Sequence, residues 1–562
     1  MDNNKWLLMR KVVIFIVWLV CMVSCSEDLS DLYKRIDELT MENADQTKQN
    51  ESQKQQNEEQ QKQNDDLQKE TDQKREQLDS INASQNSVKP KLVSMKFTVA
   101  DNPLTLKEDV QCEILNDSIV VCWTSEILDD KQLIPRFVIE GTGVTFNEEE
   151  AFSGLTKCDF KKPVTIKVFT LESMAQYTTY VYSYTGLPVL WIETEGKKAI
   201  TSKSDYLNAH IRLLENVRTR AAGDMLEADG LIKGRGNTTW SMDKKSYRLK
   251  FEEKLSLLDE PKDKSWVLLA NYADKTMLRN QTAAYMGSIS NLDYTPRFHF
   301  VDLMLNGKYN GTYQLGDKLK ISKNRVNVGD DGFLLEIDAR ATSADVQFRT
   351  NHIGQPVVIK DPDLVTGGEA YNYVKDYVLN AESSLYSTNF TDPEEGWQKY
   401  MDMDSFVDWY LINEIAKNND AVFFSSCFMN LSRNGKLKMG PIWDFDIAFG
   451  NITYNDNFSP YGFWIRKVSW YSRLFSDPAF VRRVKERFSY FYSCKDKIMQ
   501  NINEDAQYLK YSARENDKVW HIFYAESWPT YDAWGSYQNE VQSMKEWLNT
   551  RFEWLRAEFD KM

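Results

Sequence analysis

Residues 233–240 read Lys-Gly-Arg-Gly-Asn-Thr-Thr-Trp and form a polar loop with two closely spaced glycines. Gly234 and Gly236 would let backbone amides approach an anion such as a phosphate, and Arg235 and Asn237 belong to the same loop. Such a loop is weak evidence alone, because plain turns also use glycine and asparagine. It is therefore a candidate phosphate-binding segment whose interpretation depends on its neighbours in the chain.

The segment 246–251 follows this loop and alternates like a β-strand, with its aromatic and leucine side chains on one face. Arg248 and Lys250 point to the other face. A strand lysine shortly after a glycine loop is the arrangement that protein kinases use to hold nucleotide phosphates. The competing interpretation is a solvated strand face. Lys250 is the candidate phosphate ligand.

A third polar cluster, residues 413–420, ends a helix that we expect to begin near Ser405 and to be amphipathic. An aspartate at such a helix exit, here Asp420, can orient a substrate hydroxyl and accept its proton. Asn and Asp also terminate helices for purely structural reasons. Asp420 is the candidate catalytic residue.

The fourth cluster, residues 440–446, reads Gly-Pro-Ile-Trp-Asp-Phe-Asp. It places Asp444 and Asp446 between large apolar residues, where unpaired carboxylates would be costly to bury. Oxygen ligands of this kind suit Mg²⁺ or Mn²⁺ that bridges nucleotide phosphates. Structural ion pairs are the alternative. Both aspartates are candidate metal ligands.

The order of the four clusters is that of the parts of a protein kinase, although the HRD, DFG and APE motifs are missing. The glycine loop and the strand 247–251 resemble the signature of the CotH family, which is named for a spore-coat protein. Several further segments continue the resemblance, which covers residues 188–562: 266–272, 278–280, 301–303, 306–307, 332–338 and 443–446.

The resemblance implies an α+β atypical protein-kinase-like domain over residues 188–562. It also implies ATP with Mg²⁺ or Mn²⁺ as cofactors and phosphoryl transfer to Ser or Thr hydroxyls of a protein substrate. Carried over to this chain, Lys250 holds nucleotide phosphates, Asp420 is the catalytic carboxylate and Asp444 ligates metal. Asp446 is a candidate for a second metal or for supporting the first.

The chain departs from the expected pattern at two positions. Kinases usually carry a metal-binding Asn five residues after the catalytic Asp, where this chain has Ser425. Asp317 replaces a glutamate that is common in the family. No glutamate partner for Lys250 is assigned by the sequence, and Glu336 is a candidate. These departures leave open a weakly active or inactive kinase fold.

The first 25 residues have the pattern of an export signal, with basic residues, an apolar stretch from Val12 to Val23, and Ser24-Cys25. The apolar stretch is too short to span a bilayer comfortably. The segment resembles a bacterial lipoprotein signal, which predicts a lipidated Cys25 and a membrane anchor; an uncleaved anchor is the alternative. We expect an outer-membrane lipoprotein of the cell envelope, facing either the periplasm or the cell surface.

Residues 26–86 are rich in Gln, Asn, Glu, Asp and Lys and carry an unbroken heptad register. Leucine and isoleucine occupy core positions at both ends, and Asn and Gln fill the middle, where a buried Asn can fix register and oligomer state. This pattern predicts a coiled-coil stalk that could join copies of the chain; a solvated, unfolded spacer is the alternative.

Residues 87–187 contain short alternating segments separated by turn residues, which predicts a small, Ig-like β-sandwich. Cys112 and Cys122 flank a two-residue turn at 116–117. In the register expected for that turn the two thiols face opposite sides of the hairpin, so we expect no disulfide between them.

The composition excludes other classes of protein. The chain has 562 residues, a net charge of −14, 27% charged residues and 4 histidines. The acidic balance argues against a nucleic-acid partner, and the few histidines disfavour a His-rich metal site. The second functional hypothesis is a non-catalytic surface protein that binds host proteins or glycans, because the chain is rich in Trp, Tyr and Phe.

Overall fold

The structure is a computed structural model. It describes residues 89–562 except 116, 125–127, 129, 216–224, 527 and 531, together with 67–75 and the short pieces 34–35, 37–38 and 41. The export signal, Cys25 and most of the predicted stalk lie outside the described residues, and residues 67–75 are helical. Within the described part of the chain, no helix is long and apolar enough to cross a membrane.

The chain divides into two compact units, and the first contains residues up to 102 with 132–158 and 165–177. In this unit β1 (Lys91–Phe97) pairs antiparallel with β6 (Pro135–Glu140), and β7 (Gly143–Phe146) pairs with β8 (Glu149–Glu150) and β10 (Val164–Phe169). Its buried side chains include Leu92, Met95, Phe97, Val144, Phe146 and Val168. This confirms a β-rich N-terminal region. Its Ig-like topology and the boundary at residue 187 stay predictions.

The second unit begins with a β-hairpin whose register differs from the one that we expected. Strand β3 (Glu113–Leu115) pairs with β4 (Ile119–Thr124) so that Glu113 lies opposite Val121. Continuing this register by one residue puts Cys112 opposite Cys122, so the expectation that the two thiols face opposite sides was wrong. The loop between Leu115 and Ile119 has three residues instead of the two that we assumed. Both cysteines are free thiols.

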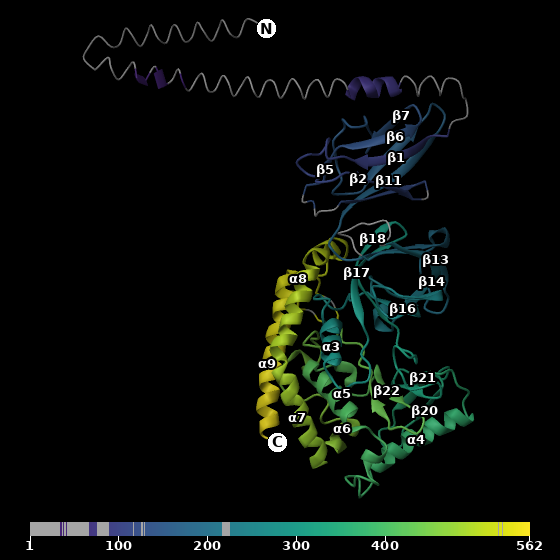
Figure 1. The fold of residues 1–562 in the computed structure, drawn as a ribbon, viewed down its shortest axis with the longest axis vertical. Helices are drawn as coiled ribbons and strands as arrows, with labels where there is room; N and C mark the ends of the chain where they lie inside the picture. Colours follow the sequence, from purple (N-terminus) through teal and green to yellow (C-terminus); the bar gives the residue numbers. More distant parts are fainter. Residues whose placement is uncertain are drawn as a thin grey trace, which may run out of the picture. The chain divides into compact units, whose positions relative to one another are not determined.

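A closed seven-stranded barrel forms the upper part of the second unit in Figure 1. Its strand order is β12 (Val189–Thr194), β13 (Leu207–Leu214), β14 (Met225–Arg235), β15 (Ser246–Leu255), β16 (Asp263–Leu269), β18 (Lys308–Asp317) and β17 (Phe298–Leu305). Asn306-Gly307 forms the β17–β18 turn, where both residues have positive φ. Apolar side chains from all seven strands fill the barrel.

A second sheet and seven helices complete the described part of this unit (Figure 1). The sheet order is β20 (Gln347–Arg349), β21 (Pro356–Asp361), β19 (Phe333–Ile337), β22 (Cys427–Leu431) and β23 (Lys438–Met439). The helices are α3 (Arg279–Ser288), α4 (Glu369–Leu385), α5 (Met403–Ala416), α6 (Ser469–Leu474), α7 (Pro478–Ser493), α8 (Lys495–Trp520) and α9 (Tyr537–Asp560). The other strands of the chain are the two-residue strands β2 (Val110–Gln111), β5 (Gln132–Leu133) and β9 (Cys158–Asp159) and the ten-residue strand β11 (Met174–Ser183).

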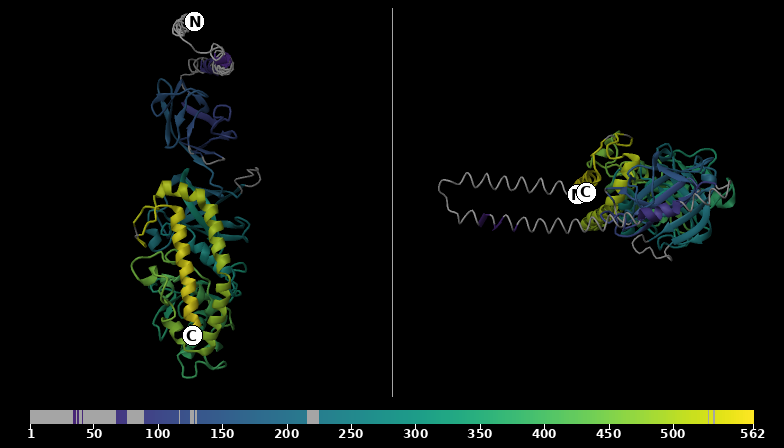
Figure 2. Two further views of the ribbon diagram at one scale, coloured as in Figure 1. Left: turned by 90° about the vertical axis from the view of Figure 1, so that its left-hand side faces the viewer. Right: turned by 90° about the horizontal axis from the view of Figure 1, so that it is seen from above.

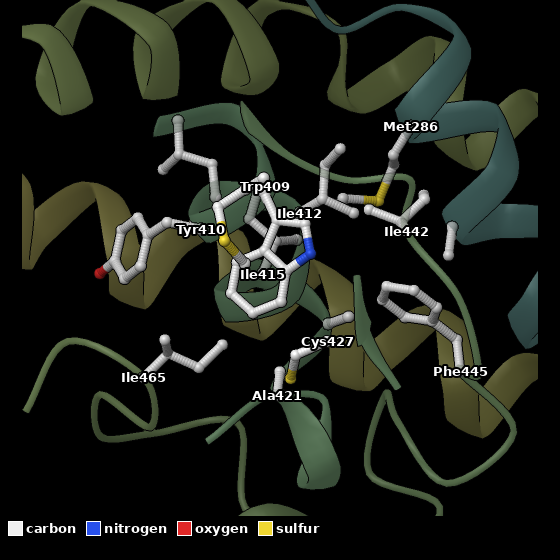
Figure 3. Close-up of a cluster of buried hydrophobic side chains, with 14 of the residues drawn as sticks. Met286, Trp409, Tyr410, Ile412, Ile415, Ala421, Cys427, Ile442, Phe445 and Ile465 are labelled. Atoms are coloured by element: carbon white, nitrogen blue, oxygen red, sulfur yellow. The ribbon is translucent and has the colours of Figure 1, made fainter. Parts of the chain in front are cut away.

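Helix α5 confirms the predicted helix that ends before Asp420, but the expected amphipathic pattern was wrong. All residues from Ser405 to Ala416 are buried, because α5 packs against α3, α7, α9 and β23. Figure 3 shows Trp409, Ile412 and Ile415 of α5 in one apolar cluster, which also contains Ala421, Cys427, Ile442 and Phe445. The segments that carry Asp420 and Asp444 are thus anchored in one core.

The final helix α9 carries a stripe of six apolar residues at helical spacing. Its six stripe residues are buried in the same core: Val541, Met544, Leu548, Phe552, Leu555 and Phe559. The two views in Figure 2 show α8 and α9, in yellow, side by side. The stripe is therefore a core-facing surface, as expected from its helical spacing.

Candidate active site

A wide cleft opens between the barrel and the second sheet of the second unit. The glycine loop lines it from the end of β14. Lys318 and Glu336 line it from β18 and β19, and Asp420 and Asp444 line it from loops that follow α5 and β23. The cleft therefore collects residues from segments that lie more than three hundred positions apart in the chain, from Lys203 to Trp528.

The glycine loop forms one wall of this cleft through Gly234, Arg235, Gly236 and Asn237. A side chain at Gly234 would meet the indole of Trp240 at 2.2 Å, so only glycine fits there. Gly236 has a φ of +97°, which L-residues rarely adopt. Gly234 is thus required by the close approach of Trp240, and Gly236 is required by its backbone conformation.

Asp420 lies in a single turn, Asn419–Ala421, directly after α5. The helix stops at Lys417, which has a left-handed φ of 47°. The Asn419 side-chain amide donates a hydrogen bond of 2.8 Å to one oxygen of Asp420, and Asn455 in turn donates to Asn419 at 2.7 Å. Burial and then the charge of Asp444 raise the pKa of Asp420. The carboxylate is therefore held in a fixed orientation and is more basic than usual.

Asp444 has a left-handed φ of 69°, an unfavourable conformation for a non-glycine residue. Three neighbours hold the segment in this conformation. Ser426 donates its hydroxyl to the Asp444 carboxylate at 3.1 Å, and Asn418 donates to the Asp444 carbonyl at 3.3 Å. The next backbone amide, that of Phe445, donates to Asn280 at 2.8 Å. Strain that is held by so many contacts is typical of functional sites.

Asp446 lies two residues further on and lines the same cleft. Burial, followed by the charges of Asp444, Asp274 and Asp420, raises its pKa well above the ordinary value. Arg235 reaches the same region, where burial lowers its pKa and the charges of Asp444 and Asp446 oppose that effect. Carboxylates gathered in a buried place, with the pKa of Asp420 and of Asp446 raised by burial and neighbouring negative charge, favour the binding of an added cation.

The donor set fits a hard divalent ion that is shared with a ligand. Among the described residues, no group of three or more His, Cys, Asp or Glu side chains could hold a metal ion by itself. Mg²⁺, however, commonly takes one or two protein carboxylates and completes its shell with phosphate oxygens and water. Asp444 and Asp446 would be those carboxylates, and Asp420 lies close enough for the charge of Asp444 to raise its pKa.

Lys250 is the one predicted site residue that the structure places elsewhere. It is exposed on β15 and is not among the residues that line the cleft. Arg248, two residues earlier on the same face of the strand, does line it. The alternation of the strand predicted the correct face, but Lys250 lies beyond the edge of the cleft, opposite Ser265 of β16.

Four basic residues of the cleft were missed by the sequence analysis: Lys203, Lys318, Arg340 and Lys360. Lys360 Nζ lies 2.9 Å from Glu336 Oε2. Burial lowers the pKa of Lys360, but the charge and hydrogen bond of Glu336 outweigh it and raise the pKa overall. Glu336, which we considered as a partner of Lys250, thus pairs with Lys360. Only the antiparallel pairing of β19 with β21 brings them together, and no local motif shows that pairing.

The two departures from the family pattern fall outside the lining of the cleft. Asp317 is fully buried in ion pairs with Arg297 at 2.9 Å and Arg325 at 3.2 Å, beside the barrel. Ser425 is buried and accepts a hydrogen bond of 3.4 Å from Arg340. Its neighbour Ser426 lines the cleft and contacts Asp444.

Of three comparisons with known proteins, one shows the family of the chain. No curated protein matches the chain. A solved structure of a candidate glycoside hydrolase from Bacteroides thetaiotaomicron has 12% identity and covers 51% of this chain and 87% of its own, but its TM-score of 0.16 is too low to support an argument. The family model described as CotH kinase protein matches residues 232–555, which is more than half of the chain. The chain therefore belongs to the CotH kinase protein family.

Proposed function

We propose that the second unit transfers the γ-phosphoryl group of ATP to a Ser or Thr hydroxyl of a protein, with Mg²⁺ or Mn²⁺. The observation that carries the proposal is the meeting of Asp420, Asp444 and Asp446 with a set of cations in one cleft. Phosphoryl transfer needs positioning and charge neutralisation more than covalent chemistry. Residues of these types in one cleft are sufficient for both tasks.

Each group has a distinct role in this proposal. The amides of the glycine loop, with Arg248, Lys318 and Lys360, bind phosphate oxygens. Asp444 and Asp446 would hold the divalent cation, which neutralises phosphate charge when bound. Asp420 accepts the proton of the attacking hydroxyl, a role suited to its fixed orientation and raised pKa. Lys360 replaces Lys250 as the phosphate ligand.

A thermal-shift titration with ATP and Mg²⁺ or Mn²⁺ tests the cofactor part of the proposal. A ligand at about 100 times its Kd should stabilise the second unit by about 2.7 kcal/mol. We expect this shift in the wild type and a much smaller one in Asp444→Ala. Asp345→Ala is the matched control, since Asp345 lines the same cleft but is exposed and bonded to Thr342. Equal shifts in Asp444→Ala and the wild type would contradict the assignment.

The proposal also predicts a pH dependence of ATP binding. Burial, and then the neighbouring charge of Arg248, lowers the pKa of Lys318 to about 8. Lys318 is therefore charged below pH 8 and loses its charge above it, so the affinity for MgATP should fall as the pH rises through 8. The expected slope is at most about tenfold in Kd per pH unit. Isothermal titration at pH 7, 8 and 9 measures it.

Lys318→Arg is the control for this pH effect, because a guanidinium stays charged throughout the range. Its affinity should stay nearly constant between pH 7 and 9. Lys318→Met should bind MgATP weakly at every pH. A slope that persists in Lys318→Arg would assign the pH dependence to another group.

Binding without catalysis is a second candidate function, and the aromatic residues at the cleft favour it. Phe424, Tyr454 and Trp528 line the cleft and are 42%, 50% and 37% exposed. The rings of Tyr454 and Trp528 are nearly parallel, at 13°, with centroids 6.4 Å apart. Such a surface could hold a sugar ring or an apolar side chain of a host protein. A test for phosphoryl transfer separates the two functions. Transfer that is lost when Asp420 is replaced favours the kinase, and binding without any transfer favours the binding protein.

The setting of this domain completes the proposal. We propose that Cys25 is lipidated, that residues 26–86 form a coiled-coil stalk able to join copies of the chain, and that residues 87–187 form an Ig-like sandwich. The protein would then be an outer-membrane lipoprotein of the cell envelope. Light scattering of the chain with and without residues 26–86 tests the stalk, and equal monomer masses would reject it.

A further inference from the structure

The stem of the β3–β4 hairpin brings two cysteines together. Three pairs define its register: Glu113 with Val121, Ile114 with Val120, and Leu115 with Ile119. Cys112 directly precedes β3, and the same register continued by one residue places it opposite Cys122. Directly opposed residues of antiparallel strands have Cα atoms about 4.5 or 5.5 Å apart. A disulfide requires a Cα separation of about 4.4–6.8 Å, so the backbone already has a suitable spacing.

The side chains of the pair face one another as well. Cys112 is 6% exposed and Cys122 is fully buried. A hydrogen bond between the two thiols contributes, after burial, to a raised pKa of Cys112. The continued register and this interaction both place the thiols on the same side of the hairpin.

From this juxtaposition we infer that Cys112 and Cys122 form a disulfide when the chain folds in the presence of a disulfide oxidant. This modification site lies outside the cleft and does not depend on the proposed function. Cys427 has a different environment, since its thiol lies near the carbonyl oxygens of Asp420 and Ser425. The pairing is thus specific to the hairpin.

The exchange proceeds in two balanced steps with glutathione disulfide as the oxidant. The Cys112 thiolate attacks one glutathione sulfur and releases one glutathione. The Cys122 thiolate then displaces the second glutathione and closes the bond. Two protein thiols are oxidised and one glutathione disulfide is reduced to two glutathiones. Because burial disfavours the thiolate, the exchange should be fast during folding and slow in the folded chain.

The disulfide would stabilise the hairpin that packs against the barrel. On the face of β4 opposite Cys122, Val121 and Trp123 pack against the barrel residues Trp191 and Tyr309. The hairpin tip contacts the β17–β18 turn, since a side chain at Gly307 would meet Leu115 at 3.2 Å. Closing the stem shortens a free loop of the unfolded chain, which stabilises the folded hairpin.

Peptide mapping of the full chain tests the inference. The protein is refolded with glutathione disulfide or with dithiothreitol, unfolded, alkylated and digested. Trypsin leaves both cysteines in peptide 108–131, and cleavage after Glu113 separates them. We expect the oxidised sample to contain this peptide two hydrogens lighter and unalkylated, with its two fragments still joined after the second cleavage. The oxidised chain should also melt a few degrees higher than the reduced one.

Two controls make the result decisive. Cys112→Ser and Cys122→Ser should each abolish the lighter peptide, and Cys158, which is half-buried, reports that the oxidant reacts. Full alkylation of Cys112 and Cys122 in an oxidised sample with a modified Cys158 would overturn the inference. A link from either cysteine to a third one would overturn it as well.

Discussion

Replacing Asp420 with asparagine is expected to lower the rate of phosphoryl transfer about 10³-fold, within the range that a general base contributes. The substitution keeps the size of the side chain and an oxygen that can accept from Asn419, as Asp420 does at 2.8 Å. It removes the basic group to which the acceptor hydroxyl would give its proton. The position of the segment is anchored by Ala421 and Phe423, which are buried in the core, so the fold should be unchanged.

The affinity for MgATP separates this loss of chemistry from a loss of binding. The charge of Asp420 is only one of several causes that raise the pKa of Asp446. Neutralising Asp420 should therefore leave the affinity for MgATP similar or slightly changed. Asp345→Asn makes the same chemical change at an exposed residue of the cleft and should keep full activity. Radiolabel transfer from ATP to a Ser/Thr-containing acceptor or to the chain itself measures the rate.

Two outcomes would contradict the role of Asp420. If Asp420→Asn transfers phosphate as fast as the wild type, another residue or the substrate itself accepts the proton. If the wild type binds MgATP but transfers no phosphate to any hydroxyl, the cleft is a binding site. The second outcome would favour the exposed Tyr454 and Trp528 as the functional surface.

Contiguous motifs were the part of the site that the sequence could predict. The glycine loop, Asp420, Asp444 and Asp446 each lie in a short polar segment between apolar elements, and the structure places them all in the cleft. A short segment keeps its neighbours whatever the rest of the chain does. Its contribution to a site can therefore be recognised without knowing the topology.

Residues whose role depends on strand pairing could not be predicted in this way. Lys360 lies on β21 and meets Glu336 only because β21 pairs antiparallel with β19. Lys250 was chosen on an alternation that gives the face of a strand but not the extent of the cleft beside it. The same reasoning failed for the cysteine hairpin, where one additional loop residue changed which side chains are opposed.

Several residues of the family motif turn out to support the backbone. Arg279 pairs with Asp274, and its guanidinium also donates to the carbonyl of Ala448 at 3.0 Å. Asn280 accepts from the Phe445 amide at 2.8 Å. These polar groups are buried, and their hydrogen bonds to Ala448 and Phe445 hold the segment that carries Asp444. A motif can therefore indicate a family while most of its members never contact the ligand.

Replacing Arg551 with alanine is expected to lower the free energy of unfolding by about 3–5 kcal/mol, the largest loss of stability among the substitutions proposed for this chain. Arg551 and Glu414 are both fully buried, with 2.7 Å between their charged groups. Arg551 also donates to the carbonyls of Pro460 and Gly462 at 2.9 and 2.7 Å. Its removal would leave a buried carboxylate without its cation, which costs far more than the loss of an exposed pair.

The pair also connects stability to the site. Glu414 lies in the last turn of α5, six residues before Asp420, and its carboxylate accepts from the backbone amides of Trp464, Ile465 and Arg466. Trp464 in turn donates its indole N–H to the Asn419 carbonyl at 3.2 Å. Loosening this network should therefore raise hydrogen exchange in residues 414–420 and 460–466 before the unit unfolds.

Urea unfolding of the full chain, followed by tryptophan fluorescence, reports mainly on the second unit, because every tryptophan except Trp6 and Trp18 lies there. Arg551→Ala should shift the midpoint to a clearly lower urea concentration. The matched control is Arg556→Ala on the same helix, whose exposed guanidinium donates to the Tyr492 hydroxyl, and it should leave the midpoint unchanged. Equal midpoints for the two variants would mean that water reaches Glu414 once Arg551 is gone. The buried pair would then not be what holds α9 and the 460–466 loop against the end of α5.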